Sequence, residues 1–267
     1  MQIYRFLRTF QRLCRAAFWL GLATICIPLV FIIPRLGPWR AGFREAVLGF
    51  FCRRIYRVLN VHLEFSGQIL SQGALLAPNH VSWLDVVILA GHHPLAFIAK
   101  ADVQDWPLIG WLCEKANALF IRRDNKFHVY REGLPAAQQA LAKGQSLVVF
   151  AEGTTANTAQ IGPLYPMFFE AAVRQTCPVQ AIAIRYLDAR GERSRAAAFI
   201  DDDGFVQSLM RIAASDITLA QIHFCPALQG HTHRKQLASH CQEQINSVLQ
   251  TRACPQNSFD HLSFVGQ

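Results

Sequence analysis

The stretch Ala74-Leu75-Leu76-Ala77-Pro78-Asn79-His80-Val81-Ser82-Trp83-Leu84-Asp85 places a short apolar run directly before a polar loop. Residues 74–77 predict a short buried strand, which ends at Pro78 because proline lacks the amide hydrogen that a central strand uses. Residues 82–90 predict a helix. The loop between the carboxyl end of a strand and the following helix is where α/β sheets build their sites. The stretch therefore predicts an α/β fold with His80 at a functional edge of the sheet.

The rest of the chain repeats this alternation of short apolar runs and helical stretches. We expect further strands at residues 61–65, 95–99, 118–121, 146–150, 179–185 and 217–224, and further helices at residues 106–114, 127–143, 205–214 and 233–249. This order predicts a mixed sheet flanked by helices. A change in composition near residue 60 predicts two parts: membrane-anchoring helices at 1–60 and an α/β domain at 61–267.

Composition and charge favour a membrane partner over nucleic acid. Hydrophobic residues make up 52% of the chain and charged residues 16%, where soluble domains carry roughly 25% charged residues. The net charge is +8, and arginines crowd the first 60 positions among apolar residues: Arg5, Arg8, Arg12, Arg15, Arg35, Arg40, Arg44, Arg53, Arg54 and Arg57. The sequence shows no zinc-finger spacing and no aromatic ribonucleoprotein signature. A basic apolar segment of this kind suits an anionic bilayer surface.

The first 60 residues leave the geometry of membrane attachment open. Residues 16–33 carry no charge and reach the lower length limit of a spanning helix. Residues 39–60 predict a basic amphipathic helix. Basic residues flank residues 16–33 on both sides, so the positive-inside rule gives no orientation. A single span and a re-entrant or interfacial hairpin both remain open, and two core helices of a soluble fold are a third alternative.

His80 and Asp85 are candidate catalytic residues. Their spacing of five suits a histidine on the loop and an aspartate in the first helical turn. Asp85 would then accept a hydrogen bond from one imidazole nitrogen and leave the other free as a base. The alternative is that Asp85 only caps the helix, because Ser82 to Asp85 also matches a capping box, and that His80 is an ordinary loop histidine.

Glu152-Gly153-Thr154-Thr155 forms a second polar loop, directly after the strand predicted at 146–150. A glycine and two hydroxyl groups after a strand can present hydrogen-bond donors to an anionic group. Such turns are common, so this pattern becomes informative only together with its neighbours.

Four stretches together resemble a known family. Asn79 to Asp85 resembles the NHxxxxD motif of the lysophospholipid acyltransferases, in the glycerophosphate acyltransferase superfamily. Phe120-Ile121-Arg122-Arg123 resembles the second block of that family, Phe150-Ala151-Glu152-Gly153-Thr154 resembles the third, and Pro178 to Arg185 resembles the fourth. The blocks occur in the family's order over about residues 75–186, which is far more specific than any single motif.

The resemblance implies roles for individual residues. It implies that His80 is the general base and Asp85 its orienting partner. It further implies a substrate-binding set, in which Arg122 binds the acceptor's phosphate or another anionic group, Lys100 supports an anionic group, and the remaining members shape the acceptor pocket: Asn79, Lys100, Arg122, Glu152, Gly153 and Thr154. No metal is expected at His231, His233, His240 and Cys241, which a polar loop entering a helix explains.

The implied reaction is transfer of a fatty acyl group from acyl-CoA or acyl carrier protein to the free hydroxyl of a lysolipid, without a cofactor. Lysophosphatidic acid is the expected acceptor and lyso-ornithine lipid the alternative. The implied location is the cytoplasmic face of a bacterial inner membrane. Two other functions remain as alternatives. One is a hydrolase that uses His80 with Ser82 or a cysteine, although the sequence has no G-x-S-x-G elbow. The other is a non-catalytic membrane-binding module.

Three departures from the family pattern concern the acceptor. Thr155 stands where many members have arginine, residues 164–170 replace a common Pro-Phe-Lys-x-Gly run, and Ala181 stands where a second proline is frequent. The first departure removes one potential phosphate contact. Together they favour an acceptor other than lysophosphatidic acid, such as a lyso-ornithine lipid.

Overall fold

The computed structural model describes residues 2–32, 40–70, 72–105, 109–115, 118–121, 129–200 and 203–251. Within these residues the chain forms a seven-stranded sheet in the order β1-β7-β6-β2-β5-β3-β4. Its strands are β1 Val61–Ser66, β2 Leu75–Pro78, β3 Ala96–Lys100, β4 Leu119–Ile121, β5 Leu147–Val148, β6 Val179–Leu187 and β7 Thr218–Phe224. Neighbouring strands run parallel except β6 and β7, which are antiparallel. The expected mixed α/β sheet is thus confirmed.

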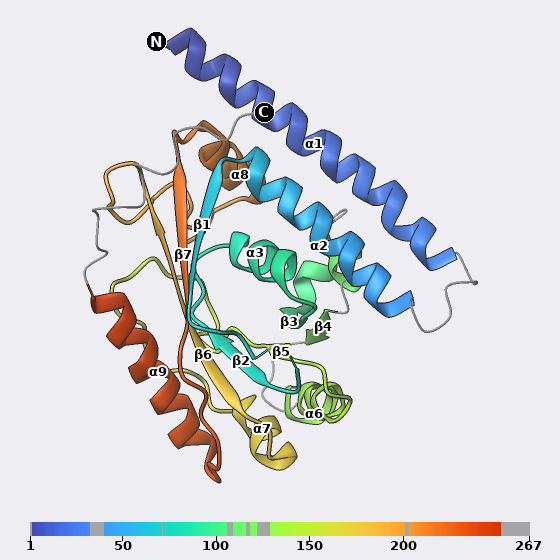
Figure 1. The fold of residues 1–267 in the computed structure, drawn as a ribbon, viewed down its shortest axis with the longest axis vertical. Helices are drawn as coiled ribbons and strands as arrows, with labels where there is room; N and C mark the ends of the chain where they lie inside the picture. Colours follow the sequence, from blue (N-terminus) through green and yellow to red (C-terminus); the bar gives the residue numbers. More distant parts are fainter. Residues whose placement is uncertain are drawn as a thin grey trace.

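Helices cover both faces of the sheet (Figure 1). They are α3 Leu84–His92, α4 Ile109–Lys115, α6 Leu134–Ala142, α7 Phe169–Gln175, α8 Phe205–Ala214 and α9 Arg234–Gln250, with a 3-10 turn η2 Ala101–Asp105 and a π-helical turn η3 Val129–Gly133. The single helix predicted over 127–143 is instead η3 followed by α6. The sequence did not predict α7.

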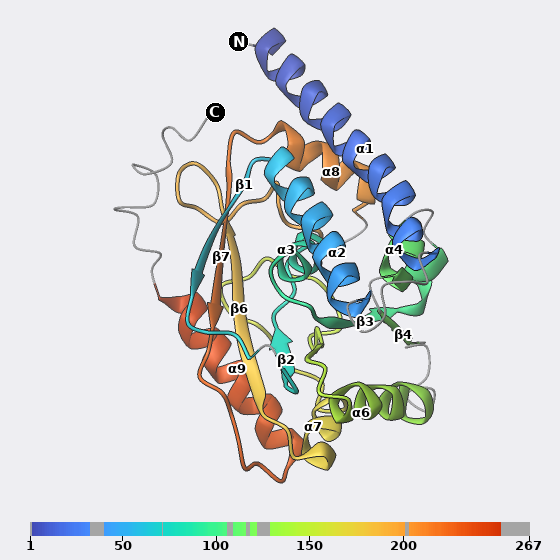
Figure 2. The ribbon, with the colours of Figure 1, turned by 45° about the vertical axis from the view of Figure 1, so that its right-hand side comes forward.

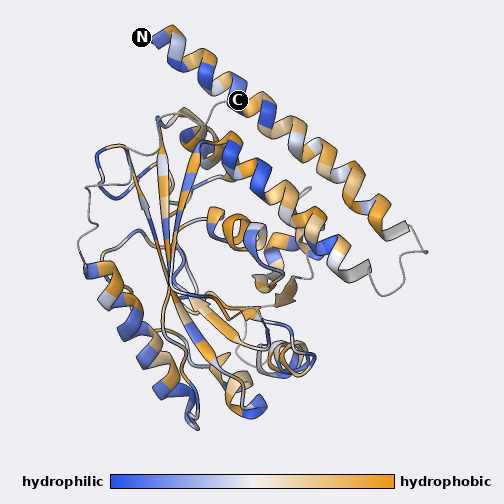
Figure 3. Cartoon of the chain, viewed as in Figure 1, coloured by the Kyte–Doolittle hydropathy of each residue, from blue (hydrophilic) through white to orange (hydrophobic). Residues whose placement is uncertain are grey.

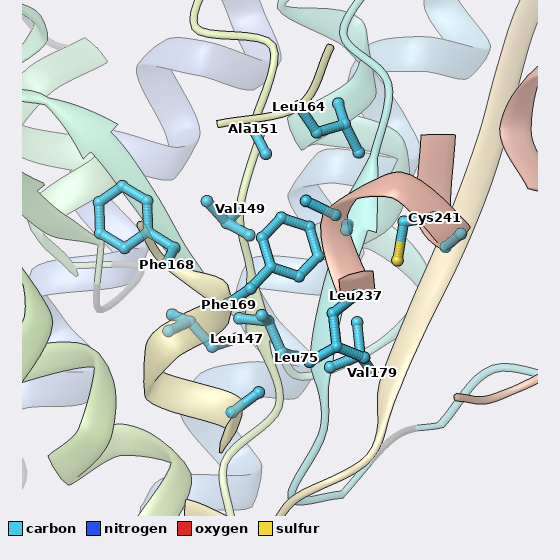
Figure 4. Packing of buried hydrophobic residues seen from close by; sticks show 14 of the residues in the cluster. Leu75, Leu147, Val149, Ala151, Leu164, Phe168, Phe169, Val179, Leu237 and Cys241 are labelled. Carbon is cyan, nitrogen blue, oxygen red and sulfur yellow. The ribbon is translucent and has the colours of Figure 1, made fainter. Parts of the chain in front are cut away.

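Alternation along the strands divides the core into two layers. Successive side chains of a strand point to opposite faces, and on β6 Ala181 and Ala183 join one cluster while Ile182 and Ile184 join the other. The first cluster packs against α6, α7 and α9. In Figure 4 the ring of Phe169, which is fully buried, lies among Leu75, Val149, Leu237 and their neighbours. The second cluster packs against α2, α3 and α8.

The two N-terminal helices form an antiparallel hairpin along one side of the domain (Figures 1 and 2). They are α1 Gln2–Ile32 and α2 Arg40–Val58. Ala23, Ile27 and Phe51 form a small core between them. α1 begins at Gln2, well before the uncharged apolar stretch at 16–33. By length and composition α1 could cross a membrane.

The N-terminal half of α1 is tied to the α/β domain at the turn between α8 and β7. The Arg8 guanidinium donates to the Asp216 carboxylate at 2.7 Å, and Arg12 donates to the backbone carbonyls of Ser215 at 2.6 Å and Ala213 at 3.0 Å. Arg5 also pairs with Asp216, at 3.5 Å. These groups form a polar clasp, in which cations meet the carbonyl end of α8, where the helix dipole favours positive charge.

The opposite face of α1 is apolar and exposed along most of its length, and Figure 3 shows hydrophobic residues spread along the helix. The exposed side chains recur at helical spacing: Ile3, Leu7, Phe10, Phe18, Ile25 and Leu29. Exposed apolar faces of this extent mark an interaction surface. The arginines of the clasp point toward the domain, and the apolar residues point away from it.

Candidate active site

The loop after β2 brings His80 and Asp85 together. The His80 Nδ1 atom lies 2.8 Å from Asp85 Oδ2. A carboxylate oxygen only accepts, so Nδ1 is the donor, and in the neutral imidazole Nε2 keeps its lone pair. The Asp85 side chain is fully buried, whereas the His80 side chain is 22% exposed. The base nitrogen is thereby oriented by a buried carboxylate on a ring that a substrate can reach.

Asp85 also holds the loop that carries His80. Its Oδ2 atom accepts hydrogen bonds from the backbone N–H groups of Val81 at 2.8 Å and Ser82 at 3.0 Å. These amides belong to the loop before α3, whose N-cap is Trp83 and has no side-chain capping bond. The same carboxylate contacts the imidazole as well. Asp85 therefore holds both the imidazole and the backbone of the loop.

The loop after β5 packs directly on the His80 loop. The Glu152 carboxylate accepts the backbone N–H of His80 at 2.7 Å, and the backbone N–H of Ala156 donates to the His80 carbonyl at 2.8 Å. The Phe150 ring stacks against the imidazole, with centroids 3.9 Å apart and an interplanar angle of 22°. Both backbone groups and one ring face of His80 are thus fixed by residues about 70 positions away.

Glu152 has an unusual proton affinity for a carboxyl group. Burial raises its pKa from 4.5 to about 7; the hydrogen bond from His80 lowers the pKa, and the nearby charge of Asp85 raises it. Glu152 therefore changes charge in the physiological pH range. We predicted from the sequence that it shapes the acceptor pocket, and in the structure it contacts the backbone of His80.

Asn79, which the resemblance places in the substrate-binding set, is bonded to the backbone of β6. Its side chain is 2% exposed; its Nδ2 donates to the Ile184 carbonyl at 2.9 Å, and its Oδ1 accepts the Ile184 N–H at 2.7 Å. The amide thus continues the hydrogen bonding of β6 beyond the end of β2. Both ends of the amide are therefore used by backbone groups. Asn79 positions the loop.

The other predicted residues lie at the same edge of the sheet or outside the described residues. Gly153 and Thr154 are exposed at the turn after Phe150. Gly153 has φ +78°, a backbone conformation that favours glycine. Lys100 ends β3, and nothing is described of its side chain. Arg122 lies outside the described residues.

Tyr186, which the sequence motifs did not indicate, donates its hydroxyl to Asp85 Oδ1 at 2.7 Å. Tyr186 is fully buried on β6. Burial, the charge of Asp85 and the hydrogen bond to Asp85 raise its pKa well above the usual value of 10. It therefore stays a neutral donor. The alternation of β6 was the signal that could have placed it, because it shares a face with Ile182 and Ile184.

The site does not present Ser82 as a nucleophile. Ser82 is fully buried, and its Oγ accepts a long bond of 3.4 Å from the N–H of Leu84. Cys225 and Cys241 are also buried, and burial raises their thiol pKa values to about 11 and about 12. A thiol with so high a pKa is a poor nucleophile at neutral pH. This geometry disfavours the hydrolase alternative.

Comparison with known proteins decides the family. A model of the Acyltransferase family matches residues 59–185. A lyso-ornithine lipid O-acyltransferase of Pseudomonas aeruginosa is 32% identical over 251 residues, which cover 91% of this chain and 95% of the relative. The chain belongs to the lysophospholipid acyltransferase family. A second relative is the 1-acyl-sn-glycerol-3-phosphate acyltransferase of Neisseria meningitidis serogroup B, 30% identical over 179 residues that cover 66% of this chain and 69% of the relative.

The fold of this lysolipid acyltransferase is also found in a solved structure. The crystal structure of the 1-acyl-sn-glycerophosphate acyltransferase of Thermotoga maritima matches with a TM-score of 0.71 at 17% identity, covering 93% of this chain and 95% of the other. At that identity the likeness shows the fold alone. The match nevertheless extends over nearly all of both chains, so it includes most of the N-terminal hairpin as well as the sheet.

Two of the four sequence blocks of the acyltransferase meet at His80, and the fourth block lies next to them. The first supplies His80 and Asp85, and the third supplies Phe150 and Glu152, which stack on and bond to His80. The fourth lies on β6, beside β2. The second block ends β4, which runs parallel to β3 at the edge of the sheet. The carboxyl ends of the parallel strands therefore gather the motifs, as expected for α/β sheets.

Proposed function

We propose that His80 is the general base for direct transfer of a fatty acyl group from a thioester to the free hydroxyl of a lysolipid. The supporting observation is the 2.8 Å contact between His80 Nδ1 and Asp85, which leaves Nε2 as the basic atom. Nε2 takes the hydroxyl proton while the hydroxyl oxygen forms the new ester bond. The carbon–sulfur bond breaks, and the leaving thiolate takes the proton from the imidazolium.

The proposed mechanism needs neither a covalent intermediate nor a cofactor. The thioester carbonyl is already activated, and Ser82 is buried, so the acceptor hydroxyl is the nucleophile. A positioned base contributes roughly 10²–10⁴-fold to such a step. Acyl-CoA and acyl carrier protein are the proposed donors, because both are acidic and the chain carries a net charge of +8.

Lyso-ornithine lipid is the acceptor we propose first. The Pseudomonas aeruginosa relative named for that acceptor is covered over 95% of its length. The presence of Thr155, where the family pattern often has arginine, also suits a head group without phosphate. Lysophosphatidic acid is the second candidate, supported by the Neisseria meningitidis relative. Its binding would assign Arg122 to the phosphate.

The hairpin formed by α1 and α2 is proposed to anchor the α/β domain, residues 61–267, to one leaflet of the membrane. A helix crossing the bilayer would carry its N-terminus away from the domain, whereas the clasp to Asp216, Ser215 and Ala213 holds it there. The exposed apolar face of α1 then enters the lipid. The proposed location is the cytoplasmic face of a bacterial inner membrane, where acyl thioesters are available. This favours the interfacial hairpin over the single span.

The function is tested with the purified full chain in mixed micelles. The assay offers acyl-CoA and acyl carrier protein donors against lyso-ornithine lipid, lysophosphatidic acid and no acceptor, with products read by mass spectrometry. We expect a diacylated product from one lysolipid, and a loss of about 10²–10⁴-fold in His80→Ala. The matched control is His233→Ala, at an exposed histidine before α9, with unchanged activity.

Three outcomes contradict parts of the proposal. Full activity of His80→Ala refutes the assigned base. Thioester consumption that needs no acceptor supports a hydrolase. A product from lysophosphatidic acid alone replaces the proposed acceptor.

Membrane attachment is tested separately. A cysteine replaces Gln2 in a chain without its native cysteines, and an impermeant maleimide is added to sealed vesicles of defined orientation. Labelling of position 2 from the side of the catalytic domain supports the one-leaflet hairpin, and labelling from the other side refutes it.

A further inference from the structure

Asp85 is held at both carboxylate oxygens, and the two oxygens have different partners. Oδ2 faces His80 and the amides of Val81 and Ser82. Oδ1 accepts from the Tyr186 hydroxyl at 2.7 Å, and within the described residues this is the only donor recorded for that oxygen. A carboxylate with one oxygen on the imidazole and the other on a phenol has its plane fixed about the side-chain bond. The orientation of His80 thus depends on both contacts.

The sheet places Tyr186 there by register. β6 pairs with β2 up to Ile182 opposite Pro78, and Asn79 extends the pairing to Ile184. Tyr186 follows Ile184 by two residues, so its side chain points to the same face of the sheet. α3 begins on that face. Tyr186 is fully buried in the core cluster of that face, so its ring has little freedom to leave Asp85. The position is determined by backbone pairing and by packing.

We propose that Tyr186 is a positioning residue for the acyl transfer, which sets the orientation of Asp85 and limits how strongly Asp85 draws the proton on His80. The proposal rests on the function proposed for His80. A hydrogen bond from the phenol withdraws negative charge from Asp85. The imidazolium formed during transfer is then stabilised less than by an unpaired carboxylate, which lets it return its proton to the leaving thiolate.

Among the described residues, Asp85 and Glu152 contact His80, and Tyr186 contacts Asp85. Asp85 comes from α3, Tyr186 acts through Asp85 from β6, and Glu152 comes from the loop after β5. Tyr186 does not ionise in the working range, because its pKa is raised well above 10. Glu152 does titrate near neutrality. A test by pH dependence must therefore separate the effect of Tyr186 from that of Glu152.

The test is the pH profile of kcat/KM for Tyr186→Phe, measured from pH 5 to pH 9 with the lysolipid and donor that the wild type uses. Without the phenol, Asp85 holds the imidazolium more strongly, and the acid limb moves to higher pH by about 0.5–1 pH unit. On the falling part of the profile, below the midpoint of the limb, this equals a loss of about 3- to 10-fold. KM for both substrates stays unchanged. The same movement is expected when the substitution is made in a Glu152→Gln chain.

The matched control is Tyr56→Phe. Tyr56 is also a buried tyrosine, 3% exposed, and its hydroxyl bonds to His92 Nε2 at 3.1 Å, outside the site. Tyr56→Phe also loses a buried hydroxyl, but the acid limb of its pH profile should match that of the wild type. A movement of the limb in both variants shows a general effect of lost hydroxyls and overturns the proposal. An unmoved limb in folded Tyr186→Phe overturns it too.

A second variant keeps the test decisive if Tyr186→Phe fails to fold. 3-Fluorotyrosine at position 186 alone retains the hydroxyl and the shape, but its phenol is a stronger donor. The acid limb should then move to lower pH, opposite to the phenylalanine variant. No movement, or movement in the same direction, contradicts the proposal. An inactive wild type would instead refute the proposed function, so the two failures are distinct.

Discussion

Replacing Glu152 with glutamine should stabilise the folded protein in a way that depends on pH. The folded pKa of Glu152 is raised to about 7, mainly by burial, and an unfolded glutamate titrates near 4.5. Below pH 4.5 the group is protonated in both states and costs nothing. As pH rises through 7, the folded chain must hold a buried carboxylate that water would solvate in the unfolded chain. The stability contributed by the raised pKa is therefore lost between about pH 5 and pH 7.

The size of the effect follows from the two pKa values. At 1.36 kcal/mol per pH unit, the difference between the folded and unfolded pKa of Glu152 lowers the free energy of unfolding by about 3 kcal/mol at pH 8 and about 1 kcal/mol at pH 5. Glutamine keeps the acceptor for the His80 N–H but carries no charge. The Tm of the variant should therefore exceed that of the wild type by about 5–10 °C more at pH 8 than at pH 5.

Thermal unfolding in detergent, followed by circular dichroism at both pH values, measures this difference. The control is Glu243→Gln, at an exposed carboxylate on α9, where we expect a change within about 0.5 kcal/mol at either pH. A stability gain of Glu152→Gln that is equal at pH 5 and pH 8 would refute the reasoning, because the gain would then not come from the ionisation of Glu152. A loss at pH 8 would show that the charge is paired in the folded state.

Two further predictions concern the clasp and the ring stack. Arg12→Ala removes hydrogen bonds to two backbone carbonyls and should lower the free energy of unfolding by about 1–3 kcal/mol; chemical denaturation measures this, Arg15→Ala at an exposed arginine is the control, and equal stability of the two variants contradicts the clasp. Phe150→Leu removes the ring under His80 and should lower kcat by about 10-fold while KM is kept, since the stack fixes the imidazole; an unchanged kcat shows that Asp85 alone orients the ring.

The sequence predicted the sheet well because its strands are short apolar runs separated by polar loops. It predicted less where a tertiary partner decides the structure. The uncharged stretch begins at residue 16, yet α1 begins at Gln2, because Arg8 and Arg12 find an acceptor and carbonyl groups at the end of α8. The short helix α7 was missed because its stability comes from burying Phe169 and its neighbours, which no local period announces.

The candidate site shows the same division between local and distant information. The pairing of His80 with Asp85 could be predicted because the two residues are five positions apart, one on the loop and the other in the first turn of the next helix. The alternation of β6 indicates which face Tyr186 occupies, but the contacts of Asn79 and Tyr186 depend on the register of β6, about 100 residues away, which no local pattern gives. The resemblance implied that Asn79 belongs to the substrate-binding set. In the structure its amide links β6 to the loop.

Asp85 carries the strongest argument that this loop is built for catalysis, because a capping aspartate would need much less. A buried carboxylate without partners costs several kcal/mol, so its donors must be counted. Two amides of the loop would serve a cap. Asp85 has in addition the imidazole on one oxygen and the phenol on the other, and its side chain is fully buried. The imidazole would hydrogen-bond equally well to water at the surface. Orienting a partly exposed ring with a carboxylate that is itself completely buried fixes Nε2 in one direction, which benefits a proton transfer and does little for the stability of a loop.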